Sequence, residues 1–315
     1  MAVRVALVGA GGMGRHHAKL ITAHPSARVV AVADADHAAA TDVARAVGAG
    51  VASDGLEAIT ASDVDAVVIA SPDATHAEYA VAALEAAKPV LCEKPLGDTV
   101  AQARAALHAE VAGGRRLLQL GLMRVYDPPH IRLRAAVSEL GAIRHVRAVH
   151  RNRNDVVRSA NLVLSQSLVH EIHSIRWLTG SEFRSVMVRA TPRPGGGVRY
   201  ATVSAELVAG GLVTIEFDDR AFGYDVSVEI ATDTGSVALD PPDDPARHGD
   251  WFGWFAEAYE AEVDAWIGAA AGGTATGPTC WDGLAAQVVV EACRTSLGSG
   301  RPAIVELPPR PVLYG

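Results

Sequence analysis

The sequence begins with the apolar run VRVALV (residues 3–8), which leads directly into the glycine-rich segment GAGGMG (residues 9–14). A short aliphatic run without polar alternation is typical of a strand that is buried on both faces of a parallel sheet. Gly9, Gly11 and Gly14 have the spacing G-x-G-x-x-G. Such glycines permit a tight turn, close approach of the backbone to a pyrophosphate, and close packing of the next helix. The segment therefore predicts a strand–turn–helix unit that binds a dinucleotide.

The same kind of unit repeats over the first 122 residues. Further buried-strand patterns lie at 28–34, 65–70, 89–94 and 116–122, and helical patterns lie at 13–23, 38–48, 76–87 and 99–112. Alternation of buried strands with helices predicts an α/β fold with a doubly wound parallel sheet. We therefore expect an NAD-binding Rossmann domain over residues 1–122.

An acidic residue indicates which dinucleotide is bound. Asp34 follows Gly14 by twenty residues, at the end of the second predicted strand. A carboxylate at this point accepts hydrogen bonds from the ribose hydroxyls and repels a 2′-phosphate, which favours NAD over NADP. Because Arg15 and Arg28 are cationic, NADP remains an alternative cofactor that is less favoured than NAD. The alternative is a glycine turn in a sheet without a cofactor, and the position of Asp34 argues against it.

Polar residues also follow the predicted strands at 65–70 and 89–94, where a doubly wound sheet opens its ligand crevice. His76 has an equally good alternative as a helix-start residue near solvent. Lys94 is one of only three lysines among 28 basic residues, and it closes a buried strand. The expected cofactor-binding residues are Gly9, Gly11, Gly12, Met13, Gly14, Asp34, Ser71, Pro72, His76, Glu93 and Lys94.

Composition limits the partners of the chain. The 315 residues are 49% hydrophobic and 20% charged, with a formal net charge of -8. Nucleic acids and anionic membranes require clustered positive charge, so neither is an expected partner. The three cysteines have no zinc-like spacing and form no even disulfide set, so we expect no metal and a cytoplasmic location. No apolar run approaches the length of a membrane-spanning helix.

The second half of the chain is rich in strands. Alternating or β-branched segments lie at 183–190, 198–208, 211–218, 224–231 and 235–240, and helical segments lie at 252–271 and 281–298. The segment PPDDPARHGD before the first of these helices reads as a loop. We expect one α+β domain over residues 123–315.

A helix with polar residues on an apolar face lies in the segment SQSLVHEIHSIRWL (165–178). Gln166, His170 and His173 are separated by four and three residues. Residues four apart share one face of an α-helix, so Gln166 and His170 can reach one bound molecule. From the residues alone, the alternative is that His170 is a satisfied core histidine.

Several motifs together resemble a known family. They are GAGGMGxxH, SPxxxH, CEKPL, GLMRVYDP, AVHRN and VHEIHSIRWLTG, and the resemblance extends over essentially the whole chain. The sequence resembles the glucose-fructose oxidoreductase, inositol dehydrogenase and MocA family, and within it the inositol 2-dehydrogenases. The resemblance implies NAD(P)-dependent oxidation of a ring CH–OH group. It also implies a large, mostly antiparallel open sheet in the second domain, through which a homo-oligomer, dimer or tetramer, is packed.

The resemblance also assigns roles to residues. Lys94 matches the lysine that hydrogen-bonds the reacting hydroxyl, and His170 matches the histidine that acts as general base in oxidation. Imidazole titrates near neutral pH and suits that task, and an ammonium stabilises developing alkoxide charge. Positions that line the polyol pocket in the family are matched by Arg124, His150, Asn152 and Tyr224. For His150 and Asn152 a structural role at a strand edge is equally open, and Tyr224 has the alternative of an ordinary sheet residue.

Gln166 departs from the family pattern, which has Asp four residues before the catalytic histidine. An amide hydrogen-bonds a hydroxyl but carries no charge. Three interpretations follow. The chain is a dehydrogenase of a cyclitol that uses Lys94, His170 and Gln166; or it acts on a sugar or nucleotide sugar; or it is a weakly catalytic NAD-binding partner or sensor protein. Retention of Lys94 and His170 favours an enzyme with a small polyol or sugar substrate.

Overall fold

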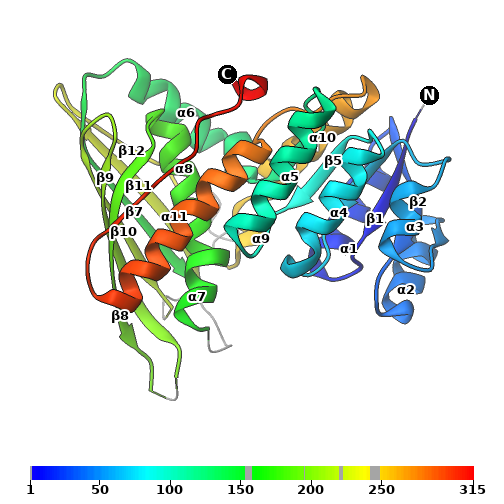
Figure 1. Cartoon of the computed structure of the whole chain (residues 1–315), viewed down its shortest axis with the longest axis horizontal. Coiled ribbons are helices and arrows are strands. Elements are labelled where there is room, and N and C mark those ends of the chain that lie inside the picture. The colour runs from blue at the N-terminus through cyan, green and yellow to red at the C-terminus, as the bar shows by residue number, and fades with distance from the viewer. Residues whose placement is uncertain (1, 153–157, 195, 220–222, 242–248) are drawn as a thin grey trace. The chain divides into compact units, whose positions relative to one another are not determined.

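The computed structural model describes residues 2–152, 158–194, 196–219, 223–241 and 249–315 (Figure 1). These residues form two compact units. Unit 1 comprises Met1–Leu122, Glu260–Gln287 and Pro309–Gly315, and unit 2 comprises Met123–Tyr259 and Val288–Pro308. The chain therefore returns to unit 1 twice near its C-terminus. The division into domains at residues 122 and 123 stays a prediction.

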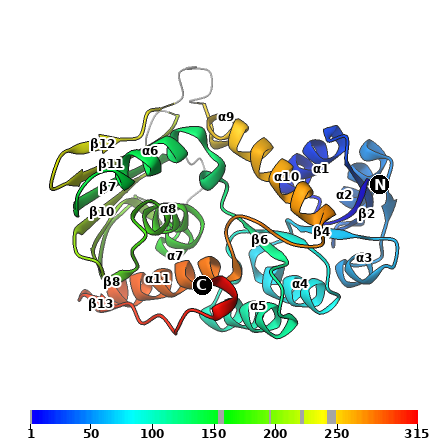
Figure 2. The same cartoon turned by 90° about the horizontal axis from the view of Figure 1, so that it is seen from above.

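Unit 1 contains the expected doubly wound sheet. All of its paired strands are parallel, in the order β3-β2-β1-β4-β5-β6. The strands are β1 (Val3–Val8), β2 (Ala27–Ala33), β3 (Gly50–Val51), β4 (Ala66–Ile69), β5 (Val90–Glu93) and β6 (Leu118–Gly121). The helices are α1 (Gly12–Ala23), α2 (His37–Val47), α3 (Gly55–Thr60), α4 (Asp73–Glu85), α5 (Val100–Gly113), most of α10 (Ala256–Ala271), the start of α11 (Cys280–Ser299) and the short η4 (Val312–Tyr314). Helices α1, α2 and α10 lie on one face of the sheet, and α3, α4 and α5 on the other (Figure 2).

Helix α10 completes the core of unit 1. Its residues Val263, Trp266 and Ile267 are almost fully buried in one cluster with Leu7 of β1 and Ile21 of α1. The sequence pattern predicted the helix but not its position, because helical periodicity does not identify the surface that the apolar face covers.

The segment around β3 and α3 was absent from the sequence expectations. Strand β3 has only two residues, too few to show a hydrophobic pattern. Helix α3 begins with a reciprocal cap: Asp54 Oδ1 accepts from the Glu57 amide at 2.8 Å, and Glu57 Oε2 accepts from the Ser53 amide at 2.6 Å. The sequence SDGLE carries this capping signal.

Unit 2 contains a mixed, mostly antiparallel sheet in the order β12-β11-β7-β10-β9-β8-β13, as the resemblance implied. The strands are β7 (Ile143–Asn152), β8 (Phe183–Pro192), β9 (Val198–Leu207), β10 (Leu212–Asp218), β11 (Tyr224–Thr232), β12 (Ser236–Ala238) and β13 (Ala303–Ile304). The other elements are η1 (Met123–Tyr126), α6 (Pro128–Ser138), α7 (Ala160–Leu162), the π-helical η2 (Val163–Leu168), α8 (Val169–Thr179) and α9 (Trp251–Trp254), together with the end of α11. Most of the predicted PPDDPARHGD loop lies outside the described residues.

Strand β7 occupies an interior position in this sheet. It pairs parallel to β10 and antiparallel to β11. His150 and Asn152 therefore belong to an interior strand and not to an edge strand of the sheet, and a structural role for them stays an open alternative. The strand was missed from the sequence because charged residues such as Arg144 and Arg147 interrupt its apolar pattern.

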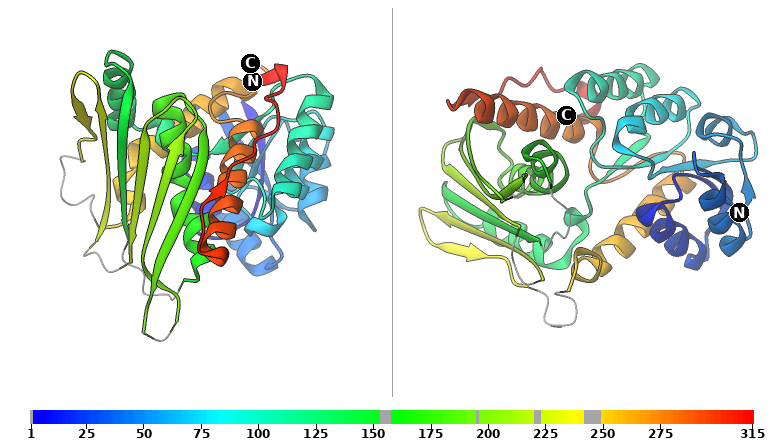
Figure 3. Two further views of the ribbon diagram at one scale, coloured as in Figure 1. Left: turned by 60° about the vertical axis from the view of Figure 1, so that its left-hand side comes forward. Right: turned by 90° about the horizontal axis from the view of Figure 1, so that it is seen from below.

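The two faces of this sheet differ. Helix α8 and the end of α11 lie on one face, where Ser296 Oγ accepts a hydrogen bond from the Val188 amide at 3.0 Å (Figures 2 and 3). On β7, β10 and β9, the polar side chains of Arg147, Glu216 and Tyr200 form a network: Glu216 accepts from both of the others at 2.8 Å.

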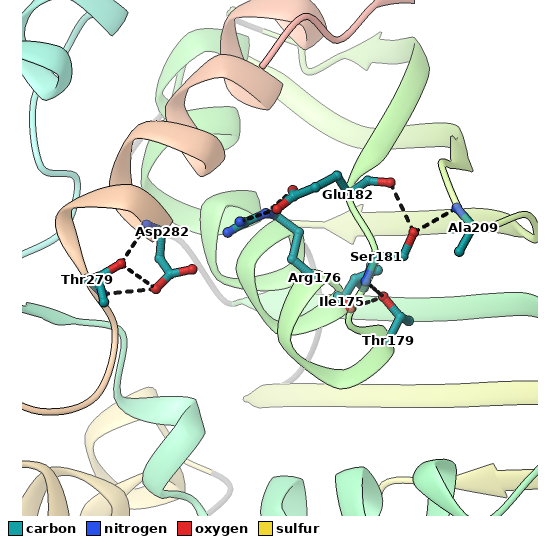
Figure 4. Close-up of polar contacts among 8 residues, drawn as sticks. All are labelled: Ile175, Arg176, Thr179, Ser181, Glu182, Ala209, Thr279 and Asp282. Carbon is teal, nitrogen blue, oxygen red and sulfur yellow. Dashed lines mark hydrogen bonds and ion pairs between the residues drawn. The ribbon is translucent and has the colours of Figure 1, made fainter. Parts of the chain in front are cut away.

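Helix α8 ends in a polar turn (Figure 4). Gly180 adopts a left-handed conformation with φ 64°. Thr179 Oγ1 donates to the Ile175 carbonyl at 2.7 Å, and Arg176 binds both carboxylate oxygens of Glu182. A left-handed glycine and paired groups of this kind satisfy the last turn of a helix, so α8 is fixed where it meets β8.

The glycine turn of unit 1 predicts a difference between two alanine variants. A Cβ at residue 14 would lie 1.9 Å from the Gly9 carbonyl oxygen, whereas a Cβ at residue 12 would have no neighbour within 4 Å among the described residues. We expect Gly14→Ala to lower the free energy of unfolding by about 1–3 kcal/mol. Gly12→Ala should leave it within about 0.5 kcal/mol. Urea denaturation without cofactor, followed by circular dichroism, measures both; equal effects would contradict the close approach.

A buried acid in α10 predicts a dependence of stability on pH. Glu262 is fully buried, and neither carboxyl oxygen has a hydrogen-bond partner among the described residues. Burial and the nearby Glu93 carboxylate raise the pKa of Glu262 well above its ordinary value of 4.5. The unfolded chain releases this proton at lower pH than the folded chain, so stability falls as pH rises above about 4.5.

Glu262→Gln should therefore increase stability more at neutral pH than at pH 4. Its matched control is Glu260→Gln, which changes an exposed acid on the same helix. Thermal unfolding midpoints at the two pH values provide the measurement. An equal gain for both variants at both pH values would show that folding does not raise the pKa of Glu262.

Candidate functional site

The glycine turn after β1 forms a close-packed phosphate-binding geometry. Gly9 has φ 105°, and a Cβ there would lie 2.4 Å from the backbone carbon of Ala70. Gly11 precedes the first residue of α1. The first amide groups of a helix lack partners within the helix and attract anions. The turn therefore fits a pyrophosphate, because only glycines leave the required space.

A cavity of about 440 Å³ lies beside this turn in unit 1. Five of the predicted cofactor-binding residues line it: Gly9, Gly11, Asp34, Ser71 and Pro72. The other predicted residues, Gly12, Met13, Gly14, His76, Glu93 and Lys94, are not among its lining residues, and their contact with a cofactor stays a prediction. Its position beside the ends of β1 and β4 is the point where the strand order of the sheet reverses, as expected for dinucleotide binding.

Asp34 is held at this cavity by backbone amides. Its Oδ2 accepts from the Ala10 amide at 2.6 Å, and its Oδ1 accepts from the Asp36 amide at 2.8 Å. Each carboxylate oxygen has a second acceptor position for a ligand hydroxyl. The carboxylate is therefore oriented before any cofactor binds.

The lining residues that the sequence analysis missed include Ser53, Asp54 and Tyr79. Ser53 and Asp54 precede α3, and Tyr79 comes from α4. Gly55 lets these segments meet, because a Cβ there would lie 2.7 Å from Tyr79 Cζ. The capping signal in SDGLE would have revealed α3, but no sequence signal connected it with Tyr79.

His76 joins the segments that follow β4 and β5. Its Nδ1 lies 2.7 Å from the Pro95 carbonyl oxygen, and its Nε2 lies 2.8 Å from that of Ser71. The side chain is 1% exposed, so the alternative of a solvent-exposed helix start is wrong. Both ring nitrogens contact protein carbonyls, which indicates that His76 orders the two segments.

Glu93 and Lys94 lie at the end of β5. Glu93 Oε1 is 2.8 Å from Nε2 of the buried His17, and Oε2 accepts from the Lys94 amide at 3.3 Å. Burial raises the pKa of Glu93, but the hydrogen bond and charge of His17 outweigh it and lower the pKa overall. The residue before Lys94 is thus a buried carboxylate that accepts a hydrogen bond from the Lys94 amide.

The helix that carries Gln166 and His170 is not α-helical throughout. Gln166 lies in the π-helical turn η2, and His170 lies in the first turn of α8. A π-helix pairs residues five apart, so the α-helical spacing rule does not by itself place these two residues, and their reach to one bound molecule stays a prediction. His170 and His173 are buried, and Gln166 is half-buried. Turns of this type occur frequently at functional sites.

Four side chains from different elements meet in unit 2. Arg124 of η1 donates through Nη2 to Glu171 Oε1 at 2.6 Å, and His150 Nδ1 lies 3.0 Å from the same oxygen. The His150 ring meets the Tyr224 ring edge-on, with centroids 5.4 Å apart. These residues form the buried polar cluster: Arg124, His150, Glu171 and Tyr224. Three of them, Arg124, His150 and Tyr224, were predicted to line one polyol pocket, and that role stays a prediction.

Charge pairing and burial determine which groups of the buried polar cluster are charged at neutral pH. Burial raises the pKa of Glu171, but the charges of Arg124 and His150 outweigh this effect and hold the pKa far below 4.5. Burial raises the pKa of Tyr224 well above 10. At neutral pH the cluster therefore contains a carboxylate, a guanidinium and an uncharged phenol.

Glu171 was missed from the sequence, although it lies between two predicted histidines in HEIH. Asn152, which was predicted, lies opposite Tyr224 in the pairing of β7 with β11. Over the described residues, no group of three or more His, Cys, Asp or Glu residues is arranged to hold a metal ion. No described helix is both long and apolar enough to cross a membrane.

Comparisons of sequence give three family-profile matches. They are the oxidoreductase family with an NAD-binding Rossmann fold (residues 3–121), the GFO/IDH/MocA C-terminal domain (130–238) and the oxidoreductase C-terminal alpha/beta domain (216–307). Inositol 2-dehydrogenase 1 of Saccharopolyspora erythraea is 40% identical over 100% of both chains. Inositol 2-dehydrogenase of Rubrobacter xylanophilus is 40% identical over 99% of this chain and 96% of its own.

Solved structures agree with these matches. The myo-inositol dehydrogenase of Lactobacillus casei, in complex with NAD(H) and myo-inositol, is 27% identical, with a TM-score of 0.94 over 100% of both chains. GenD2 from gentamicin A biosynthesis, in complex with NAD, is 25% identical, with a TM-score of 0.85 over 97% of both chains. Full-length identity to relatives and the glycine turn beside Asp34 agree: the chain belongs to the GFO/IDH/MocA family and is an NAD-dependent oxidoreductase.

Proposed function

We propose that this protein oxidises a secondary ring hydroxyl of a cyclitol, inositol or aminocyclitol-like, to a ketone, or catalyses the reverse reaction. Bound NAD⁺ supplies the hydride acceptor. The observation that supports this proposal is the buried polar cluster, whose four residues are only 1–4% exposed. Selective binding of several ring hydroxyls requires fixed polar partners, because such a site penalises analogues that lack them. The names of the full-length relatives support the same substrate class.

Two residues are proposed to act on the reacting hydroxyl. Lys94 hydrogen-bonds its oxygen and stabilises the charge that develops when the proton leaves. His170 takes that proton as a general base, or returns it in reduction. A contribution of each to the same step remains a prediction from the sequence and the family resemblance.

Gln166 is proposed to read a neighbouring hydroxyl of the substrate. Its amide donates and accepts hydrogen bonds, but it lacks the charge of an aspartate that would stabilise a histidinium. The substitution favours a substrate that differs from the usual inositol at one ring position. A sugar or nucleotide sugar is the second candidate. A weakly catalytic sensor or partner protein is the third.

A homo-oligomer, dimer or tetramer, is also proposed from the family resemblance. The face of the unit 2 sheet that carries Arg147, Glu216 and Tyr200 offers a polar surface for such packing. Sedimentation velocity of the full chain measures the assembly directly.

The first functional prediction concerns Lys94. Purified protein with NAD⁺ should form NADH, seen at 340 nm, with at least one member of a panel of inositols, aminocyclitols, sugars and nucleotide sugars. Lys94→Ala should lower kcat by about 10²-fold or more, because an electrostatic partner of the reacting oxygen is lost. Lys19→Ala, an exposed lysine on α1, is the control and should retain activity. Silence across the panel with NAD⁺ binding intact would favour the sensor interpretation.

The second functional prediction concerns Gln166. Gln166→Asp should raise kcat/KM for myo-inositol, because a carboxylate near His170 stabilises its protonated form. The same change should lower kcat/KM for the substrate preferred by the wild type, which relies on the amide. Steady-state kinetics with both substrates measures the exchange of preference. A loss of activity toward every substrate would contradict the role of Gln166 as a hydroxyl reader.

A further inference from the structure

The buried polar cluster contains a carboxylate–imidazole pair, formed by Glu171 and His150. His150 Nδ1 lies 3.0 Å from Glu171 Oε1, and both side chains are buried, at 3% and 1% exposure. Arg124 Nη2 donates to the same carboxylate oxygen at 2.6 Å. The three groups come from β7, α8 and η1, so tertiary structure holds them together. This arrangement fixes the orientation of the imidazole ring.

The pair also fixes the tautomer of His150. An ionised carboxylate accepts hydrogen bonds and donates none, so Nδ1 must carry the hydrogen. In the neutral ring, Nε2 then holds the lone pair and is the basic atom. The same logic orients the histidine of a Ser-His-Asp triad, where a carboxylate partner at Nδ1 leaves Nε2 to accept a proton.

Nε2 of His150 is buried without a hydrogen-bond partner among the described residues. A buried polar atom of this kind requires a partner from a ligand or from water. The ring is packed between the aromatic rings of Phe217 and Tyr224, with centroid distances of 5.8 and 5.4 Å. This packing holds the ring in place. A substrate hydroxyl is the donor that such a site lacks.

Among the described residues, the titratable and charged groups next to His150 come from η1, α8 and β11. Arg124 from η1 and Glu171 from α8 carry opposite charges, so together they orient the ring without adding net charge. The charge of His170 on α8 also lowers the pKa of Glu171. Tyr224 on β11 is uncharged at neutral pH, because burial raises the pKa of its phenol. The carboxylate that Gln166 lacks for His170 is thus present for His150.

We propose that His150 is a second acceptor for the single proton that this oxidation releases, so that in each turnover the proton goes either to His170 or to Nε2 of His150. The inference rests on the proposed oxidation of a ring hydroxyl. The hydroxyl O–H bond breaks and its proton forms a bond with Nε2, while the carbon gives up a hydride to NAD⁺ and becomes a ketone carbon. The alcohol is oxidised, NAD⁺ is reduced, and the imidazolium later releases its proton to water. In reduction, His150 donates the proton.

Two variants of His150 separate a base from a binding residue. His150→Asn keeps an amide donor near the Nδ1 position for Glu171, and His150→Gln keeps a polar group near the Nε2 position for substrate. Neither side chain accepts a proton at ordinary pH. The control is His145→Gln on the same strand, where Nε2 of the half-buried His145 contacts Thr214 Oγ1 at 3.1 Å.

The experiment measures kcat and KM for oxidation by NAD⁺ over about pH 6–10, with the panel member that the wild type oxidises fastest. We expect both His150 variants to lower kcat at least about ten-fold and to alter the rising limb of its pH profile. A lone general base contributes about 10²–10⁴-fold, and His170 shares the task. His145→Gln should match the wild type. An increase in KM with kcat and its pH profile unchanged would overturn the inference.

A spectroscopic measurement tests the tautomer without turnover. Two-bond nitrogen–proton correlation spectra of the full chain distinguish the two neutral tautomers, and the signals of His150 are those that vanish in His150→Gln. The Nδ1–H tautomer supports the inference, and the Nε2–H tautomer overturns it. If the wild type oxidises no member of the panel, the proposed function fails and takes the proton transfer with it. Turnover with normal kcat in both variants overturns only the role of His150.

Discussion

A single buried carboxylate, Glu171, determines how unit 2 is organised around its buried polar cluster. Leaving a buried charge without its partner costs roughly 3–5 kcal/mol, so the fold must bring donors to it. Arg124 and His150 supply them from segments that are distant in sequence. The guanidinium also lies over the Phe255 ring, 5.4 Å from its centroid. The need to neutralise one charge therefore ties together η1, β7 and α8.

Much of the fold was predictable because its elements carry local signals. The strands of unit 1 are continuous apolar runs, and the glycine turn occupies the one place where its geometry is required. The failures have local causes too. Strand β3 has two residues, which is below the length of any pattern. Strand β7 carries arginines on one face, which hides its buried face from a search for apolar runs. Sheet order and the position of α10 depend on tertiary contacts that periodicity does not encode.

The site was predictable in its members more than in its geometry. Arg124, His150 and Tyr224 were expected in one pocket and do meet, but the residue that joins the first two, Glu171, was missed. The neighbouring His170 was predicted to act as a general base, whereas an acid on a helix usually faces solvent, so no role was predicted for Glu171. The π-helical turn at Gln166 was also unforeseen, because no residue type marks such a turn. The joint reach of Gln166 and His170 to one bound molecule therefore stays a prediction.

The position of α10 has a consequence for how the protein is made. The ribosome releases the strands of unit 1 first, but the helix that buries Trp266 against them follows more than a hundred residues later, and Tyr314, whose hydroxyl contacts Glu110 at 2.5 Å, comes at the very end. Chains grow from the N-terminus at about 5–20 residues per second. The part of the sheet face that α10 covers therefore stays exposed for many seconds during synthesis, although α1 and α2 already lie on that face, and chaperones and wrong partners compete for the exposed part in this period.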